Sequence, residues 1–302
     1  MDIEQLRTFD RIVRDGSFTK AAARLNVTQA TVSMRLRALE DLLGTPLIER
    51  GRKLALTEAG TTFLPFARRI LATVVEGRHA LRTVDRGEIS LASLRSLVRV
   101  LTAGTVADFA AAHPGIAITV EEGRHRDIAE HVHDRRVDLA VMGWPNLDPL
   151  LDAVAPLAIL RERVPLCASP ALAAAIGPEP TLDRIFEVAP QFLRLFWWQL
   201  MPDAIAALGF RARVTSAVPY APARAMIEKG LAVGHLLEPL VREALDAGRL
   251  VELVPTDMAV PTRDSALVVG KPGALERPLV AELAGRLITA AGAIGMSVTD
   301  LR

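Results

Sequence analysis

The hydrophobic positions of the first 43 residues recur every three or four residues and are interrupted by turn signals. This spacing predicts three short helices, over residues 3–14, 18–25 and 29–43. Ser17 and Thr28 immediately precede the second and third helices and are suited to cap their N-termini. The apolar stripes consist of Leu6, Phe9, Ile12 and Val13 in the first helix and of Val32, Leu36, Leu39 and Leu43 in the third.

A hairpin and a long helix are predicted next. Residues 47–50 and 54–56 favour short strands around a turn that carries the basic residues Arg52 and Lys53. Residues 58–84 predict a helix about 40 Å long. Its apolar positions approach a heptad seam and are Phe63, Phe66, Ile70, Val74, Gly77, Leu81 and Val84. A helix of this kind usually pairs with a partner helix, and the alternative is that it packs only on its own domain.

From residue 89 onward the pattern changes to short strands that alternate with helices. Strands are predicted at 89–93, 116–121, 137–142, 163–168, 192–196, 212–217, 231–236 and 265–270, and helices at 96–112, 124–134, 170–176, 202–208, 221–228, 239–247 and 275–291. This alternation indicates parallel α/β sheets. A chain of 302 residues accommodates two or three domains.

The net charge of +1 conceals an asymmetry along the chain. Residues 1–88 contain 15 Lys and Arg against 11 Asp and Glu, a net charge of +4, whereas the remainder has a net charge of −3. A basic first third suggests that this part of the chain meets a polyanion, although a solvated charged surface would give the same count.

The sequence favours a cytoplasmic protein. The single cysteine, Cys167, cannot form a disulfide within the chain, and its apolar strand favours a buried thiol over a redox switch. No N-terminal secretory-signal pattern is found, since the first turn already carries Asp2, Glu4 and Arg7, and no long uncharged apolar stretch predicts a membrane span.

The helices over 18–25 and 29–43, followed by a basic hairpin, make a device for reading DNA. The second helix of such a pair enters the major groove, and its first turns meet the base edges. Glutamine can pair with adenine and arginine with guanine, while serine and threonine bond bases or phosphates. A basic hairpin tip reaches phosphates or the minor groove and sets affinity. The candidate DNA contacts are Thr28, Gln29, Ala30, Thr31, Ser33, Met34, Arg35, Arg52 and Lys53.

The first 70 residues densely resemble the LysR-type transcriptional regulators. The resemblance is carried by Leu6-Arg7-Thr8-Phe9, Gly16-Ser17-Phe18-Thr19-Lys20-Ala21-Ala22, Leu25-Asn26-Val27-Thr28-Gln29, Leu39-Glu40, Leu47-Ile48-Glu49-Arg50 and Leu56-Thr57-Glu58-Ala59-Gly60. Looser signatures follow at 109–116, 122–123, 137–141 and 230–234. The resemblance implies DNA contact by Gln29, Thr31, Ser33, Arg35, Arg52 and Lys53. This chain departs from the family at Met34, because many members have an arginine directly after the helix serine.

The resemblance also implies the domain plan. The expected fold is a mostly α-helical winged helix-turn-helix followed by an α/β effector domain of two subdomains, similar to periplasmic binding proteins. The expected boundaries are 1–58 for the DNA-binding domain, 59–88 for the dimerising linker helix and 89–302 for the effector-binding domain. Within the last, subdomain I spans 89–160 plus 265–302 and subdomain II spans 161–264.

Ligands of such sheets bind at the carboxyl ends of strands, near helix N-termini that favour anions. The candidate effector-binding residues are Ser93, Ser96, Arg124, His125, Gly143, Trp144, Trp198 and Tyr220. Several of these residues have a plainer alternative. Ser96 would only cap a helix, Arg124 would be a surface charge, and one of Trp197 and Trp198 would belong to the core. For an anionic effector, Arg124 and Arg194 are the first cations to test.

Two other classes of protein fit the sequence less well. An enzyme is disfavoured because no nucleophile elbow, P-loop, zinc-protease or dinucleotide motif occurs, and a solute-binding protein would not carry a DNA-reading N-terminus. His131 and His133 stand two apart in a predicted helix and face different ways, so no metal or other cofactor is expected. The expected partners are double-stranded promoter DNA, a small-molecule effector and further copies of the chain, as a homodimer or homotetramer. RNA polymerase joins them if the protein activates transcription.

Overall fold

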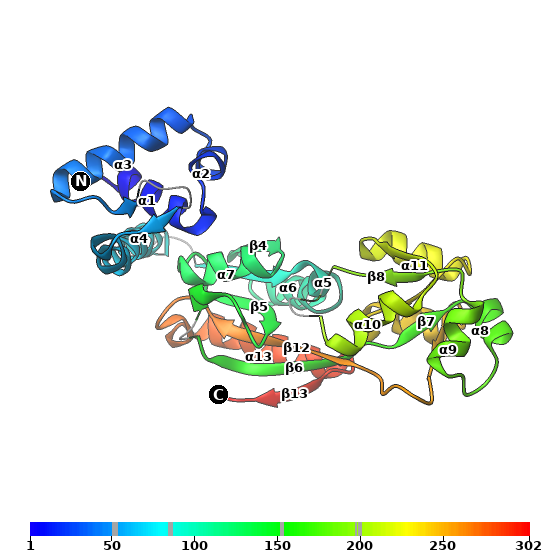
Figure 1. Ribbon diagram of the computed structural model, residues 1–302. Coiled ribbons are helices and arrows are strands. Elements are labelled where there is room, and N and C mark those ends of the chain that lie inside the picture. Colours follow the sequence, from blue (N-terminus) through cyan, green and yellow to red (C-terminus); the bar gives the residue numbers. More distant parts are fainter. Residues whose placement is uncertain (50–53, 84–86, 152–153, 197, 199–200) are drawn as a thin grey trace. The chain divides into compact units, whose positions relative to one another are not determined.

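The computed structural model describes residues 1–49, 54–83, 87–151, 154–196, 198 and 201–302 (Figure 1). The chain divides into two compact units, Met1–Gly87 and Glu88–Arg302, which are described separately. Within the described residues, none of the helices combines the length and the apolar character that crossing a bilayer requires.

In the part of the first unit that the structure describes, the chain forms four helices and a small hairpin. Its elements are α1 (Ile3–Asp15), α2 (Phe18–Leu25), α3 (Gln29–Leu43), β1 (Ile48–Glu49), β2 (Ala55–Leu56) and α4 (Glu58–Thr83). Ser17 and Thr28 cap α2 and α3 as predicted, because their side chains accept hydrogen bonds from the backbone N–H groups of Lys20 and Thr31. The helix bounds match the predicted ranges to within one residue.

The predicted apolar stripes form the core of this unit. Leu6, Phe9, Ile12, Val32 and Leu39 are each 1% exposed or less. The first half of α4 covers the same core, with Ala67 fully buried and Phe63, Leu64 and Ile70 packed around it. Phe63 and Ile70 of the predicted seam therefore pack on their own domain, whereas Phe66 of the same seam stays 49% exposed. Val84 lies outside the described residues.

The second unit contains two sheets. The first has the strand order β13-β6-β12-β5-β3-β4. Its strands are β3 (Glu88–Leu94), β4 (Ala117–Gly123), β5 (Leu139–Trp144), β6 (Pro156–Arg163), β12 (Thr262–Val269) and β13 (Ser297–Asp300). One face packs on α5 (Arg95–Leu97), η1 (Val98–Thr102), α6 (Ala103–Ala112) and α13 (Pro278–Ala293), and the other on α7 (His125–His133) and η2 (Pro149–Leu151). A further short helix, η3 (Ala274–Glu276), precedes α13.

The second sheet has the order β11-β7-β10-β8-β9. Its strands are β7 (Leu166–Ala168), β8 (Phe192–Arg194), β9 (Thr215–Ala217), β10 (Val233–His235) and β11 (Val251–Leu253). Its helices are α8 (Pro170–Ile176), α9 (Leu182–Val188), α10 (Asp203–Arg211), α11 (Tyr220–Glu228) and α12 (Glu238–Asp246). The first three cover one face of the sheet, and the last two cover the other.

The prediction of parallel sheets is correct only in part. β3 pairs in parallel with β4 and β5, but β12 is antiparallel to both β5 and β6, and β13 is antiparallel to β6. The reason is that β6 and β12 carry the chain out to the second sheet and back. Both strands belong whole to the six-stranded sheet, so the subdomain boundaries expected at 160/161 and 264/265 fall inside strands.

A buried charge network holds the beginnings of β3 and β5 together. The Asp138 carboxylate accepts hydrogen bonds from the backbone N–H of Ser90 at 2.8 Å and from its hydroxyl at 2.9 Å. It also accepts from Lys271 Nζ and from Arg277 Nη1, both at 3.0 Å. Burial raises the pKa of Asp138, but the hydrogen bond from Ser90 and the two cations outweigh it and leave that pKa below its ordinary value. Burial and the charge of Arg277 leave the pKa of Lys271 below its ordinary value, although Asp138 acts to raise it.

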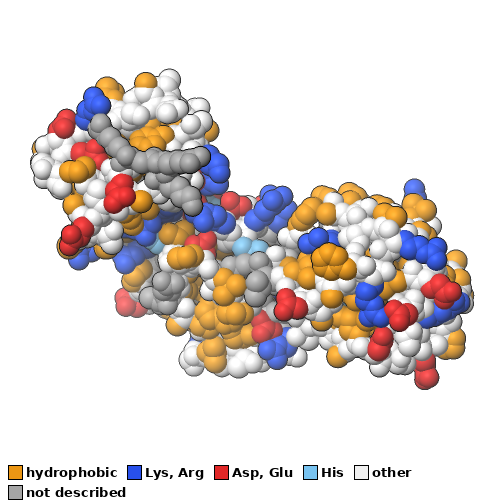
Figure 2. Space-filling model, viewed as in Figure 1, with side chains coloured by type: hydrophobic (Ala, Val, Ile, Leu, Met, Phe, Trp, Pro, Cys, Tyr) orange, Lys and Arg blue, Asp and Glu red, His pale blue; other side chains and the backbone are white. Residues whose placement is uncertain are grey.

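The net charge of −3 in the second part of the chain does not gather into one acidic patch on the face shown in Figure 2. Acidic and basic side chains are interspersed there over the second unit. The two parts of the chain therefore differ in net charge, but on this face the second unit does not present a surface of one sign.

Candidate functional site

The helix α3 is positioned by its neighbours so that one side is left open. Val32, Leu36 and Leu39 point into the core, where they meet side chains of α1 and α2. The turn before α3 places Asn26 in the left-handed region at φ 54°, a conformation that asparagine tolerates. The opposite side of α3 exposes Gln29, Ala30, Ser33, Met34, Arg37 and Ala38.

The polar groups at the start of α3 are held by local hydrogen bonds. Thr28 Oγ1 accepts from the backbone N–H of Thr31 and lies 2.9 Å from Thr31 Oγ1. Gln29 Oε1 accepts from the hydroxyl of Thr19 on α2 at 3.2 Å. The first turn of the helix is thus fixed to its partner helix, as a surface that reads base edges requires.

Arg35, a predicted DNA contact, is turned toward α1. Its Nη1 lies 3.1 Å from Glu4 Oε2, and its side chain is only 24% exposed. Arg37, which the sequence reasoning missed, is exposed and has no ion-pair partner among the residues that the structure describes. The signal was present, because Gln29, Ser33 and Arg37 are spaced four apart and share one side of the helix.

The hairpin after α3 is anchored to the helix. The backbone N–H groups of Leu47 and Ile48 donate to Glu40 Oε1 at 2.8 and 3.2 Å, and Ile48 pairs with Leu56 across the two strands. The predicted wing contacts, Arg52 and Lys53, lie between β1 and β2 in the sequence and outside the described residues.

In the second unit, the candidates Ser93, Gly143 and Ser96 gather where β3 and β5 end. Ser93 is fully buried and accepts a hydrogen bond from Thr102 Oγ1 at 2.9 Å. Gly143 is buried opposite Ser265 of β12. Ser96 is half-buried and accepts from Arg263 Nη1 at 3.1 Å.

A buried ion pair that the sequence reasoning missed lies beside them. Arg263 of β12 donates from Nε to Glu162 Oε1 of the paired strand β6, at 2.6 Å. Burial raises the pKa of Glu162, and the charge of Arg263 offsets this only in part. Glu162 Oε2 and Ser265 Oγ are buried without a hydrogen-bond partner among the described residues. Both strands carry several charged residues, at 161–163 and at 263–264, so the sequence did not single out this pair.

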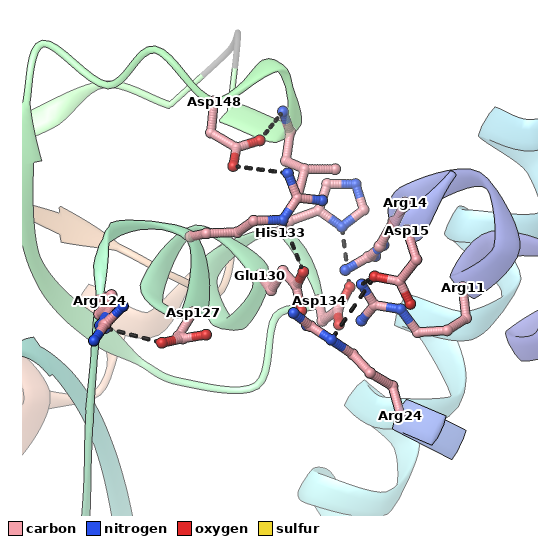
Figure 3. A network of polar contacts seen from close by, with 12 residues as sticks. Arg11, Arg14, Asp15, Arg24, Arg124, Asp127, Glu130, His133, Asp134 and Asp148 are labelled. Atoms are coloured by element: carbon pink, nitrogen blue, oxygen red, sulfur yellow. Dashed lines mark hydrogen bonds and ion pairs between the residues drawn. The ribbon is translucent and has the colours of Figure 1, made fainter. Parts of the chain in front are cut away.

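Arg124 and His125 lie at the N-terminus of α7. The backbone N–H of Arg124 donates to Asp127 Oδ2 at 2.9 Å, which closes the first turn (Figure 3). The Arg124 side chain is exposed and His125 is half-buried. Trp144, at the end of β5, is also half-buried and packs against the core beneath α7.

The candidates of the second sheet are half-buried against its core. Trp198 and Tyr220 pack against the hydrophobic cluster that includes Leu195 and Val241, and the Tyr220 hydroxyl donates to the carbonyl oxygen of Leu240 at 2.8 Å. Burial raises the pKa of Tyr220, while Arg224 and Arg99 act to lower it. Because Arg99 belongs to η1, Tyr220 lies within electrostatic reach of the first sheet's helical cover. Trp197 lies outside the described residues.

The histidines have carboxylate neighbours on separate sides of α7. His131 Nε2 lies 3.0 Å from Glu121 Oε2, and His133 Nδ1 lies 3.0 Å from Asp134 Oδ1. Among the residues that the structure describes, no three histidine, cysteine or carboxylate side chains are grouped to hold a metal ion.

Two family models match the chain. Residues 3–61 match the bacterial regulatory helix-turn-helix protein model of the lysR family, and residues 82–291 match the LysR substrate binding domain model. Together they span both units.

Curated relatives are similar over part of their length. The regulator CfxR of Cupriavidus necator is 36% identical over 174 residues, which make up 56% of this chain and 54% of the relative. The RuBisCO operon transcriptional regulator of Allochromatium vinosum is 33% identical over 159 residues, 51% of this chain and 52% of the relative. The chain thus spans about half the length of the curated relatives it matches.

Solved structures are similar over nearly the whole chain. ArgP from Mycobacterium tuberculosis has a TM-score of 0.56 at 23% identity and covers 96% of this chain and 97% of its own. The Vibrio cholerae virulence activator AphB has a TM-score of 0.51 at 22% identity, covering 94% and 98%. At these identities the likeness concerns the fold.

Proposed function

Because the chain belongs to the LysR family of bacterial helix-turn-helix regulatory proteins, we propose that it is a transcriptional regulator that binds promoter DNA and responds to a small molecule. The observation that carries the proposal is α3, whose exposed side presents Gln29, Ser33 and Arg37 on a helix-turn-helix scaffold. Both relatives described above are named as transcriptional regulators, which favours regulation over catalysis. A protein of this kind works where the chromosome is, in the cytoplasm.

Two copies of the chain would pair through the exposed side of α4, where Phe66 lies. Pairing places two α3 helices on half-sites one DNA turn or a multiple of it apart. Pairing of effector domains would then join two dimers into a tetramer. In an activator, this assembly would also contact RNA polymerase.

The effector would bind between the two sheets of the second unit. The proposed lips are the ends of β3 and β5 with Ser93, Ser96 and Trp144, and the start of α11 with Tyr220. Exposed Arg99 and Arg124 favour a negatively charged ligand. Binding would shift the balance between two arrangements of the subdomains and so the geometry of the DNA-binding pair.

DNA binding is tested by fluorescence anisotropy on the region upstream of the protein's own gene and on random DNA, across a salt series. We expect preference for the upstream DNA, and a loss of roughly 5- to 150-fold in that preference for Gln29→Ala. Arg37→Ala should lower the slope of log affinity against log salt by about one. Arg249→Ala, which removes an exposed arginine of the second unit, is the matched control. Failure to bind either DNA at low salt would refute the proposal.

The ligand site is tested by a thermal-shift screen of small organic acids, phosphates and amines against the full chain. An anion that raises the melting temperature of the wild type but not that of Arg99→Ala or Tyr220→Phe supports the proposed lips. An amine that stabilises all three proteins equally argues for a different site.

A further inference from the structure

The exposed side of α3 carries an apolar row beside its polar one. The row consists of Ala30, Met34, Ala38 and Leu42, which follow one another at intervals of four residues and are all exposed. Met34 is 65% exposed and Leu42 is 57% exposed. Side chains four apart lie one above the other on a helix, so this row runs alongside Gln29, Ser33 and Arg37.

Met34 occupies the middle of the surface expected to meet the bases. It follows Ser33 directly and stands one turn beyond Ala30, within the first two turns of a helix that begins at Gln29. The next residue, Arg35, is paired with Glu4 and directed toward α1. The large side chain available at this point of the helix is therefore apolar and not cationic.

We propose that Met34 reads thymine, by packing its side chain against the C5-methyl group of one thymine in each half-site. The methyl group of thymine is the apolar group that base pairs present in the major groove. Methionine is long, unbranched and flexible, so it can follow such a group. We assign DNA as the partner of this apolar row for two reasons. The row runs beside the polar residues of the proposed DNA-binding surface, and residues 1–88 have a net charge of +4.

Leu42 is not part of this contact. It lies two turns beyond Met34, outside the first turns that meet base edges. It therefore provides an equally exposed apolar side chain on the same row for comparison. The inference rests on the proposed DNA-binding function.

The test begins with an operator obtained from a random-sequence library by selection with the full-length protein. Each thymine is then replaced singly by deoxyuridine, which removes only the methyl group, and affinity is measured by anisotropy. For the wild type we expect a loss of roughly fourfold at one thymine per half-site, the effect of one buried methyl group. Met34→Ala should bind the operator more weakly and lose this sensitivity, whereas Met34→Leu and Leu42→Ala should keep it.

Two results on an enriched operator would overturn the inference and leave the proposed function intact. One is that no thymine shows sensitivity to deoxyuridine. The other is that Met34→Ala keeps the wild-type sensitivity to deoxyuridine. This would hold even if the substitution changed how strongly the protein self-associates. If the selection enriches no sequence at all, the proposed function fails and the inference fails with it.

Discussion

Cys167 is a buried thiol in β7, where its Sγ donates to the carbonyl oxygen of Pro165 at 3.7 Å. Burial raises the pKa of the thiol to about 12, and the nearby carboxylates of Glu252 and Glu238 act in the same direction. The reactive thiolate is therefore scarce at neutral pH. We expect Ellman's reagent at pH 8 to label the folded protein slowly and the urea-unfolded protein rapidly. Rapid stoichiometric labelling of the folded protein would contradict this assignment.

The carboxylate of Asp138 supports the fold through Lys271, Arg277 and Ser90. Removing one partner from a buried ion pair leaves the remaining charges buried without a counter-charge. Asp138→Asn should therefore lower the free energy of unfolding by about 3–5 kcal/mol at pH 7. The pKa of Asp138 is lowered in the folded protein, so its contribution is present above the ordinary value of 3.8 and is lost as the pH falls through the folded value.

Urea unfolding at pH 7 and at successively lower pH checks this prediction, and the difference between wild type and Asp138→Asn should shrink toward acid. Asp300→Asn is the matched control. Its carboxylate also has a lowered pKa, of about 2, but it lies at the surface beside Arg302, with 43% of its side chain exposed. Equal effects of the two substitutions at pH 7 would show that burial is not what makes Asp138 matter.

Some features of the candidate site could be predicted from single residues and their neighbours, and others could not. The periodicity of α3 identifies which positions face outward, and Gln29, Ser33 and Met34 are exposed as expected. The partner of Arg35 is Glu4, 31 residues away, and a local pattern does not reveal such a contact. The pairing of Glu162 with Arg263 spans 101 residues and depends on the register of β6 against β12.

At the scale of elements, helices with a stripe and a cap could be predicted, and so could the three-residue strands β8, β9 and β10, which lie inside the predicted ranges 192–196, 212–217 and 231–236. The strands β11 and β13 could not. The N-caps at Ser17 and Thr28 and the stripes of α1 and α3 depend on neighbouring residues alone. β13 and β11 have four and three residues, and their exposure does not alternate, so their place at sheet edges is decided by distant backbone partners. Of the strand predicted at 163–168, Arg163 is the last residue of β6 and residues 166–168 form β7, which belongs to the other sheet.

The contact between α4 and the hairpin depends on a glycine. A Cβ atom at Gly60 would stand 2.0 Å from the carbonyl oxygen of Leu47, which is backbone and cannot rotate away. Gly60→Ala should therefore destabilise the first unit by about 1–3 kcal/mol. Gly104 of α6 has no atom within 4 Å of the same position. Gly104→Ala should stabilise its helix by roughly 0.5–1 kcal/mol. Circular dichroism melts check both signs, and destabilisation of equal size would contradict the steric argument.

At the scale of the whole molecule, the exposed Phe66 is the residue through which self-association can be tested. The guanidinium of Arg69 lies over its ring, 5.2 Å from the ring centroid, and the side chain is 49% exposed. Phe66→Glu should weaken dimerisation at least tenfold, since pairing would bury a charge in an apolar seam. Analytical ultracentrifugation measures the change.

Phe210→Glu is the matched control for this prediction. Phe210 is 93% exposed on α10 of the second unit. This substitution should leave the α4-mediated dimer intact. If Phe66→Glu forms dimers as strong as those of the wild type, pairing does not run through this side of α4.

The interleaving of the two sheets has a consequence for how the protein is made. β3, β4 and β5 leave the ribosome first, but their neighbour β12 begins only at residue 262, after the whole second sheet has been synthesised. Between the end of β5 and the start of β12 lie roughly 120 residues, which take about 6–24 s at ordinary bacterial elongation rates. Throughout that interval β5 presents an unpaired apolar edge, while the four helices at the N-terminus already have all the partners of their core. Nascent chains of this protein should therefore carry a finished helix-turn-helix unit ahead of a half-built sheet, and it is the sheet that chaperones would have to protect.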